Sequence, residues 1–142
     1  MRRPLSGIAL IALLAVTATA CDDDDSPTTP TTPTTTEVTE TYTGTLQRNG
    51  GLTFTFRNNV AGSLVASLSS LDPDTTAAIG LAIGTWNQER FACQLTIVND
   101  AAFEGAAVVG TTTGTAELCV RIYDSRGELT GPVGFVVTVI HP

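Results

Sequence analysis

Three cysteines and one histidine are the side chains in this sequence best suited to covalent, redox or metal chemistry. Cys93 and Cys119 both lie in stretches that alternate apolar and polar residues, which predicts strands. The sequence contains no C-x-x-C pair of the kind that activates a thiol in redox proteins. In an oxidising compartment this even pair is most simply a structural disulfide, which would close a loop of about 27 residues and stabilise the fold by roughly 3.5 kcal/mol. Two buried free thiols that act as small hydrophobic side chains are the alternative.

The single histidine, His141, stands one residue from the end of the sequence. We expect it in a frayed terminus, where an imidazole lacks the orienting partner that a general base needs. The chain also has no lysine, no G-x-S-x-G motif and no cluster of zinc ligands. These features predict a non-enzymatic protein with no catalytic residue and no cofactor.

Calcium is the metal that the acidic side chains suit best, because it binds oxygen ligands. Asp72 and Asp74 stand two residues apart, on either side of Pro73, in a predicted turn. Ca²⁺ needs about six to eight converging oxygens, and other loops would have to supply most of them. The alternative is that these carboxylates form turns by accepting hydrogen bonds from their own backbone. We therefore expect no metal site.

Residues 86–91 have the composition of a contact surface. Trp86, Arg90 and Phe91 are residue types enriched at interaction hot spots, and in an exposed loop they would form a protein or carbohydrate contact patch. The alternative, which we favour, is that Trp86 and Phe91 plug the end of a hydrophobic core. The chain has only eight aromatic residues, so its core needs each of them.

The first twenty residues have the order of a secretory signal, with Arg2 and Arg3 followed by an apolar run over 8–16 and small residues before Cys21. The apolar run is shorter than the roughly 20 residues that span a bilayer. The segment 18–21 resembles the lipobox of bacterial lipoproteins, although Ala18 stands where Leu is usual. This resemblance implies that Cys21 carries fatty acyl chains such as palmitate and anchors the protein to membrane lipid in the cell envelope, facing the periplasm or the exterior. Ordinary cleavage after residue 20, which would leave a free thiol, is the alternative.

Residues 21–37 predict a disordered tether. Four aspartates at 22–25 precede a Thr-rich stretch with proline at every third position, which favours extended polyproline geometry. The whole chain has 14 acidic residues against 7 arginines, a net charge of −7. Nucleic acid is therefore not an expected partner, because no basic stripe is present to neutralise phosphates.

Residues 38–142 alternate apolar and polar side chains in short runs separated by turn residues, which is typical of an all-β sandwich. We expect seven to eight strands, near 38–46, 52–56, 64–68, 79–83, 93–97, 108–109, 118–122 and 135–139. Asn49 and Gly50 predict a β-hairpin between the first two strands. A helix over 77–83 is an alternative that the neighbouring glycines disfavour.

Three segments resemble the bacterial pre-peptidase C-terminal (PPC) domain: residues 43–64, the strand 118–123 and the closing strand 135–139. The resemblance implies a single jelly-roll-like β-sandwich over 38–142. Domains of that family are appended to secreted peptidases, and some relatives bind collagen or other polymers. The chain departs from the family in lacking a catalytic domain upstream and in the sequence of its central strand, 78–83.

Together, the signal and the sandwich predict a membrane-anchored cell-envelope lipoprotein that acts as a binding or structural module. Its expected partners are membrane lipid through Cys21 and an envelope or extracellular polymer or protein. The alternative that the family resemblance suggests is an accessory or inhibitory partner of a secreted peptidase.

Overall fold

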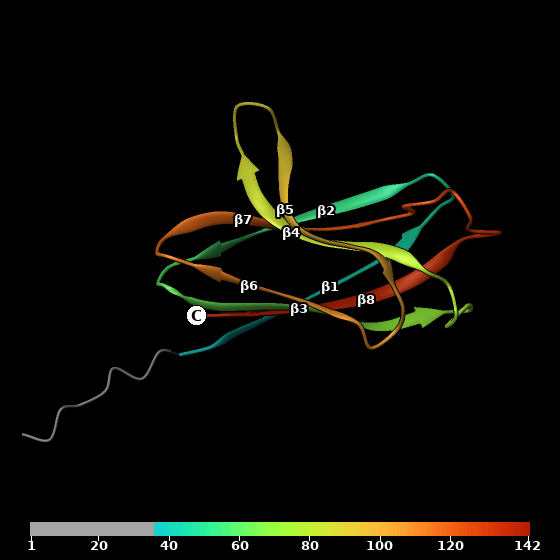
Figure 1. Cartoon of the computed structure of the whole chain (residues 1–142), viewed down its shortest axis with the longest axis horizontal. Coiled ribbons are helices and arrows are strands. Elements are labelled where there is room, and N and C mark those ends of the chain that lie inside the picture. The colour runs from blue at the N-terminus through green and yellow to red at the C-terminus, as the bar shows by residue number, and fades with distance from the viewer. Residues whose placement is uncertain (1–35) are drawn as a thin grey trace, which may run out of the picture. The chain divides into compact units, whose positions relative to one another are not determined.

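The computed structural model describes residues 36–142 (Figure 1). The predictions for the signal, for Cys21 and for most of the tether fall on residues 1–35 and lie outside this part of the chain. The eight strands, in chain order, are β1 (Val38–Leu46), β2 (Gly51–Asn58), β3 (Gly62–Asp72), β4 (Ile79–Asn87), β5 (Ala92–Ala102), β6 (Ala107–Thr112), β7 (Ala116–Tyr123) and β8 (Val133–His141). The all-β prediction is confirmed, and residues 79–83 lie in a strand instead of the alternative helix.

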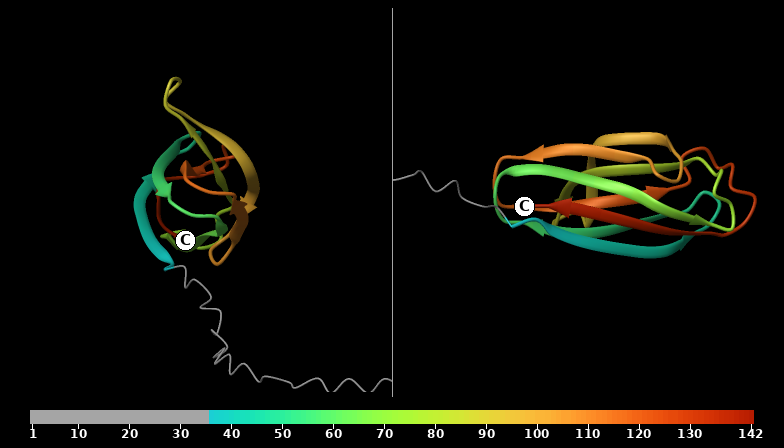
Figure 2. Two further views of the ribbon diagram at one scale, coloured as in Figure 1. Left: turned by 90° about the vertical axis from the view of Figure 1, so that its left-hand side faces the viewer. Right: turned by 90° about the horizontal axis from the view of Figure 1, so that it is seen from below.

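The strands form two antiparallel sheets that pack face to face (Figure 2). One sheet has the order β1-β8-β3-β6 and the other the order β2-β7-β4-β5. Most consecutive strands therefore belong to different sheets. This is the strand order of an eight-stranded jelly roll, which confirms the predicted fold class.

The turn at Asn49 and Gly50 connects the two sheets. Asn49 has a positive φ of 57°, and the Gly50 N–H donates to the Gln47 carbonyl over 2.8 Å, so the expected tight turn is present. However, β1 pairs with β8 and β2 pairs with β7, so the predicted hairpin is wrong. The turn residues determine that the chain reverses here, but they do not determine which strands then pair.

The hydrophobic core lies between the sheets and follows the alternation of the sequence. In β8 every second side chain points inward and is buried, and β3 follows the same alternation except at a bulge between Leu68 and Leu71. The inward residues of these two central strands are Val133, Phe135, Val137 and Val139 of β8 and Leu64, Ala66, Leu68 and Leu71 of β3. Each large side chain among them contributes about 1.5–3 kcal/mol by leaving water. At the side of the sandwich where β1 and β2 are the edge strands, Tyr42 stacks on Phe54 with ring centroids 4.8 Å apart.

β4 differs from the other strands because both of its faces are buried over residues 79–84. Ile79, Leu81 and Ile83 form the inner face. On the outer face, the ring of Tyr123 lies where a β-carbon of Gly80 would be. The small outward residues of β4 therefore allow other parts of the chain to pack against it from outside.

A single carboxylate, that of Asp124, organises the end of the sandwich where β7 leads into β8. Asp124 is 8% exposed and accepts hydrogen bonds from four backbone amides. The donors are Asn49 at 2.9 Å, Gly127 at 2.9 Å, Glu128 at 3.2 Å and Leu129 at 3.4 Å. Burial by itself raises the pKa of Asp124, but these four hydrogen bonds outweigh it and hold the pKa below its ordinary value of 3.8. The carboxylate thus joins the β1–β2 turn to the β7–β8 loop.

Replacing Asp124 with asparagine is expected to lower the free energy of unfolding by about 2 kcal/mol, because an amide cannot accept all four hydrogen bonds. Because the pKa of Asp124 is lower in the folded protein than in the unfolded chain, the carboxylate contributes its full stabilisation at pH values above the ordinary carboxyl pKa. This stabilisation is lost as the pH falls through the lower pKa of the folded protein. Urea unfolding should therefore show a gap between the original protein and the variant at neutral pH that narrows in strong acid. Glu128→Gln, which removes a charge from an exposed position in the same loop, is the control. A gap that is equally wide at both pH values would contradict this assignment.

Candidate functional site: the β4–β5 hairpin

The hairpin that joins β4 to β5 leaves the body of the sandwich and projects outward from the β2-β7-β4-β5 sheet (Figures 1 and 2). The pairing of β4 with β5 shifts register between Ile83 and Gly84, which marks a bulge at the point of departure. Beyond this point, Trp86 pairs with Cys93 and Asn87 with Ala92, so the projecting part remains a two-stranded ribbon.

At the base of the hairpin, β5 crosses closely over β4 at Gly84. A β-carbon on Gly84 would lie 2.7 Å from the carbonyl carbon of Gln94 and 2.9 Å from Cα of Leu95. Because both of these atoms belong to the backbone, no side-chain rearrangement could make room for it. The crossing therefore requires glycine at position 84.

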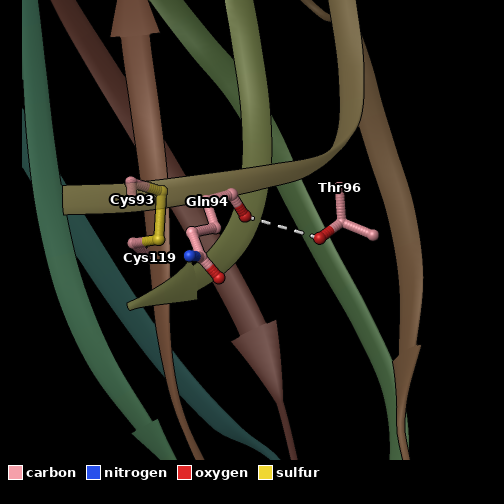
Figure 3. The surroundings of a disulfide bond; sticks show 4 residues. All are labelled: Cys93, Gln94, Thr96 and Cys119. Atoms are coloured by element: carbon pink, nitrogen blue, oxygen red, sulfur yellow. Dashed lines mark hydrogen bonds between the residues drawn. A yellow bond between two sulfur atoms is a disulfide. The ribbon is translucent and has the colours of Figure 1, made fainter. Parts of the chain in front are cut away.

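The crossing also brings β5 within reach of β7, although β4 lies between them in the order of the sheet. Cys93 of β5 and Cys119 of β7 form a disulfide with their Cα atoms 5.9 Å apart (Figure 3). Cys119 is fully buried. The disulfide predicted from the sequence is confirmed, and it attaches the base of the hairpin to the outer face of the sheet.

The tip of the hairpin is fixed by local hydrogen bonding. The Asn87 side-chain oxygen accepts a hydrogen bond from the Arg90 N–H over 2.9 Å. Phe91, the last residue of the turn, has a positive φ of 49°, which is unusual for a bulky side chain. The turn therefore holds Phe91 in a defined position.

Phe91 is 81% exposed, more than any other large hydrophobic residue in the described part of the chain. Arg90 beside it is exposed, and Trp86 on the β4 arm is half-buried. Neither aromatic residue belongs to the hydrophobic core. The alternative that we favoured, in which Trp86 and Phe91 plug the core, is therefore wrong for Phe91. The three residues singled out in the sequence lie on one projecting element.

The two calcium candidates lie elsewhere, in and after the end of β3. Asp72 is exposed, and Asp74 accepts hydrogen bonds from the N–H of Thr76 over 3.0 Å and from its hydroxyl over 2.7 Å. These bonds lower the pKa of Asp74 and are those of a turn-forming aspartate. Within residues 36–142, no group of three or more histidine, cysteine, aspartate or glutamate side chains is arranged to hold a metal ion.

His141 does not lie in the frayed terminus that the sequence predicted. It lies in β8, opposite Val38 of β1, and is 2% exposed, so the frayed terminus predicted from the sequence is wrong. Its Nε2 lies 3.2 Å from a carboxylate oxygen of Glu40, whose other oxygen accepts a hydrogen bond from the Tyr42 hydroxyl. Burial and the bond to Glu40 raise the pKa of Tyr42, so the phenol stays protonated as the donor. The three side chains tie β1 to β8.

Gly84 positions the site but is not among the site residues predicted from the sequence. A local signal was present, because glycines at 80 and 84 in a buried strand indicate close approach of other groups. The sequence does not show that the approaching group is the next strand of the same chain.

The fold and the site together define a jelly-roll β-sandwich with a disulfide-braced projecting hairpin. No protein-family model matches the chain, and a comparison with curated proteins finds no relative. The resemblance to the PPC domain therefore remains a prediction, while the sandwich that it implied is present.

Two further observations bear on where the protein works. The disulfide indicates an oxidising, extracytoplasmic compartment. No helix in the part of the chain that the structure describes is long and apolar enough to cross a membrane.

Proposed function

We propose that this protein is a lipid-anchored, non-enzymatic lipoprotein of the cell envelope that binds an envelope or extracellular polymer or protein through its β4–β5 hairpin. The observation that carries the proposal is Phe91, 81% exposed at the tip of a braced projection. When a partner covers an exposed aromatic side chain, its apolar surface is removed from water, which favours binding. Aromatic and arginine side chains also contribute most of the binding energy at many interfaces.

The construction of the hairpin supports this proposal. The disulfide fixes its base, and the Asn87 side chain fixes its turn. A loop that is already ordered before binding loses little conformational entropy when a partner arrives, which strengthens binding. The convex shape of a hairpin suits a partner with a groove or pocket.

A second candidate function is that of an accessory or inhibitory partner of a secreted peptidase. The jelly-roll strand order favours it, because this is the architecture implied by the resemblance to the PPC domain. The same hairpin would then contact a folded protein instead of a polymer.

The anchoring part of the proposal predicts that Cys21→Ser releases the protein from membranes. Loss of two or three acyl chains removes about 0.8 kcal/mol for every methylene buried in the bilayer, so the variant should move from the membrane pellet to the supernatant. Intact mass of the purified protein should show acyl chains on the original chain and none on the variant. An original chain whose mass corresponds to residues 21–142 without acyl groups would contradict the anchor.

The binding part predicts that Phe91→Ser weakens retention on the cognate polymer by roughly tenfold or more, which corresponds to about 1.4 kcal/mol. The assay is co-sedimentation of the full chain with peptidoglycan, cellulose or collagen fibrils. Phe103→Ser is a matched control, because Phe103 is 51% exposed in the β5–β6 loop, away from the hairpin tip. Equal loss in both variants would argue against the hairpin as the contact surface. Capture of a secreted peptidase that depends on Phe91, without polymer binding, would favour the second candidate.

A further inference from the structure

The outer face of the β1-β8-β3-β6 sheet consists of short-chain, uncharged residues. In each of its strands the outward positions alternate with inward ones that are less exposed, apart from a bulge in β3 at Ser69 and Ser70. These outward residues are Thr39, Thr41, Thr43 and Thr45 of β1, Gly134, Val136, Thr138 and Ile140 of β8, Ser63, Val65, Ser67, Ser69 and Ser70 of β3, and Ala107, Val109 and Thr111 of β6. The only charged outward residue of the four strands is Asp72, the last residue of β3. We call this surface the uncharged face.

The opposite sheet shows that the lack of charge is particular to this face. On the outside of the β2-β7-β4-β5 sheet, Arg57 pairs with Glu117 at 3.5 Å, and the guanidinium of Arg121 lies 5.6 Å from the ring centroid of Tyr123. Residues 36–142 contain ten carboxylate side chains and five arginines. A domain with a net charge of −5 therefore keeps one of its two broad faces free of charge, except for Asp72 at one end of β3.

The register of the strands arranges the uncharged face in rows. Ile140 of β8 pairs with Thr39 on one side and with Val65 on the other, and Val65 pairs with Val109. This row of β-branched residues crosses all four strands, and Val109 at its end is 60% exposed. β-branched side chains have few rotamers to lose, so covering them costs little entropy.

We propose that a second copy of this chain docks on the uncharged face, sheet against sheet. Nine-residue strands such as β1 and β8, at about 3.3 Å per residue and about 4.8 Å between strands, give the face roughly 600 Å² in projection. The accessible surface of its side chains exceeds the projection, which brings it near the roughly 800 Å² per partner of a standard interface. A two-fold dimer would bury the same surface on both copies.

Charge and shape both favour a second copy over other occupants. Two copies with like net charge repel, but apposing their uncharged faces keeps the charged sheets on the outside of the dimer. Two identical sheets have the same twist and can pack about 10 Å apart at about 30°, as the layers of a sandwich do. A flat polymer surface would not match a twisted sheet. The chain's own segment 22–35 is a poor occupant, because it would bring four aspartates onto this face.

Sedimentation equilibrium of the full chain in a density-matched detergent tests the proposal, which does not depend on the function of the hairpin. The original chain is expected to dimerise, and Thr138→Glu, near the middle of the face, should weaken the dimer more than tenfold because it brings like charges together. Val109→Glu should act in the same direction, and its exposure makes the substitution compatible with folding. Thr55→Glu, on the exposed outer side of β2, is the matched control and should leave the dimer unchanged.

A monomeric original chain, or a dimer that is insensitive to both Thr138→Glu and Val109→Glu, would overturn the proposal. Equal weakening by Thr55→Glu would also overturn it, since the effect would then come from net charge instead of this face. A monomer whose binding to an insoluble polymer is lost in Thr138→Glu would assign the face to that polymer and exclude the second copy.

Discussion

Replacing Gly84 with alanine is expected to lower the free energy of unfolding by about 3 kcal/mol and to separate the hairpin base from β7. A methyl group at this position would collide with the backbone of Gln94 and Leu95, so β5 would have to move away from β4. Overpacking of a well-packed site typically costs about 1–3 kcal/mol, and a rigid backbone neighbour places this substitution at the upper end. Movement of β5 would also carry Cys93 away from Cys119, so the disulfide should form less completely when the reduced variant is refolded in oxidised glutathione, and more free thiols should remain.

Urea unfolding, and thiol titration after refolding of the reduced chain in oxidised glutathione, measure the two effects of Gly84→Ala. Gly131→Ala is the matched control, because nothing lies within 4 Å of a β-carbon built at Gly131. The control should change the free energy of unfolding by less than about 1 kcal/mol. If Gly84→Ala unfolds at the same urea concentration as the original protein, with its disulfide intact, the close crossing of β5 over β4 is wrong.

The strands could be predicted because local alternation is sufficient to define them. In β8, the inward valines and phenylalanine alternate with the outward residues Gly134, Val136, Thr138 and Ile140, and the structure buries every second side chain. The partner of each strand could not be predicted in this way. Asn49 and Gly50 form a tight turn, and such a turn can connect two strands of one sheet or two strands of different sheets. The sequence therefore predicted a hairpin, although at this turn the chain passes from one sheet to the other.

The residue types of the candidate site could be predicted from the sequence, but their exposure on a projecting hairpin could not. Trp86, Arg90 and Phe91 were recognisable as interaction-prone types, but their exposure depends on whether the hairpin stays in its sheet. Whether the hairpin leaves the sheet depends on the bulge before Gly84 and on how closely β5 passes over Gly84. Both features arise from contacts between residues of different strands. The scarcity of aromatic residues suggested that Phe91 belongs to the core. The core is instead filled mainly by valine, leucine and isoleucine.

His141 shows a similar limit of sequence reasoning. Its place near the end of the sequence suggested fraying, yet β8 lies between β1 and β3 in its sheet and is held from both sides. A residue near the end of a chain is ordered when its strand is central. The position of a strand within a sheet is a property of the topology, which the sequence around His141 does not encode.

Removal of the disulfide is expected to have the largest effect on stability. In the chain-entropy model, a loop with a sequence separation of 26 residues contributes roughly 3.5 kcal/mol. The double substitution of Cys93 and Cys119 with alanine should therefore lower the midpoint of thermal unfolding by roughly 10–20 °C. Alanine is preferred to serine because Cys119 is fully buried, where a hydroxyl would lack a hydrogen-bond partner.

The disulfide is also expected to hold the hairpin in place locally. A measurement of hairpin opening distinguishes this local effect from the general contribution of the disulfide to stability. Arg90 is the only basic residue between β3 and β7, so trypsin cleavage after it reports opening of the hairpin specifically. Without the bond to β7, the hairpin base is held only by its pairing with β4, and local opening should become more frequent. We expect faster cleavage after Arg90 in the double variant at temperatures where the sandwich remains folded, and the same increase when the original protein is reduced. The double variant itself should not respond to reductant, which makes it the control for side effects of the reagent. Unchanged cleavage after reduction would show that the crossing at Gly84 holds the hairpin by packing alone.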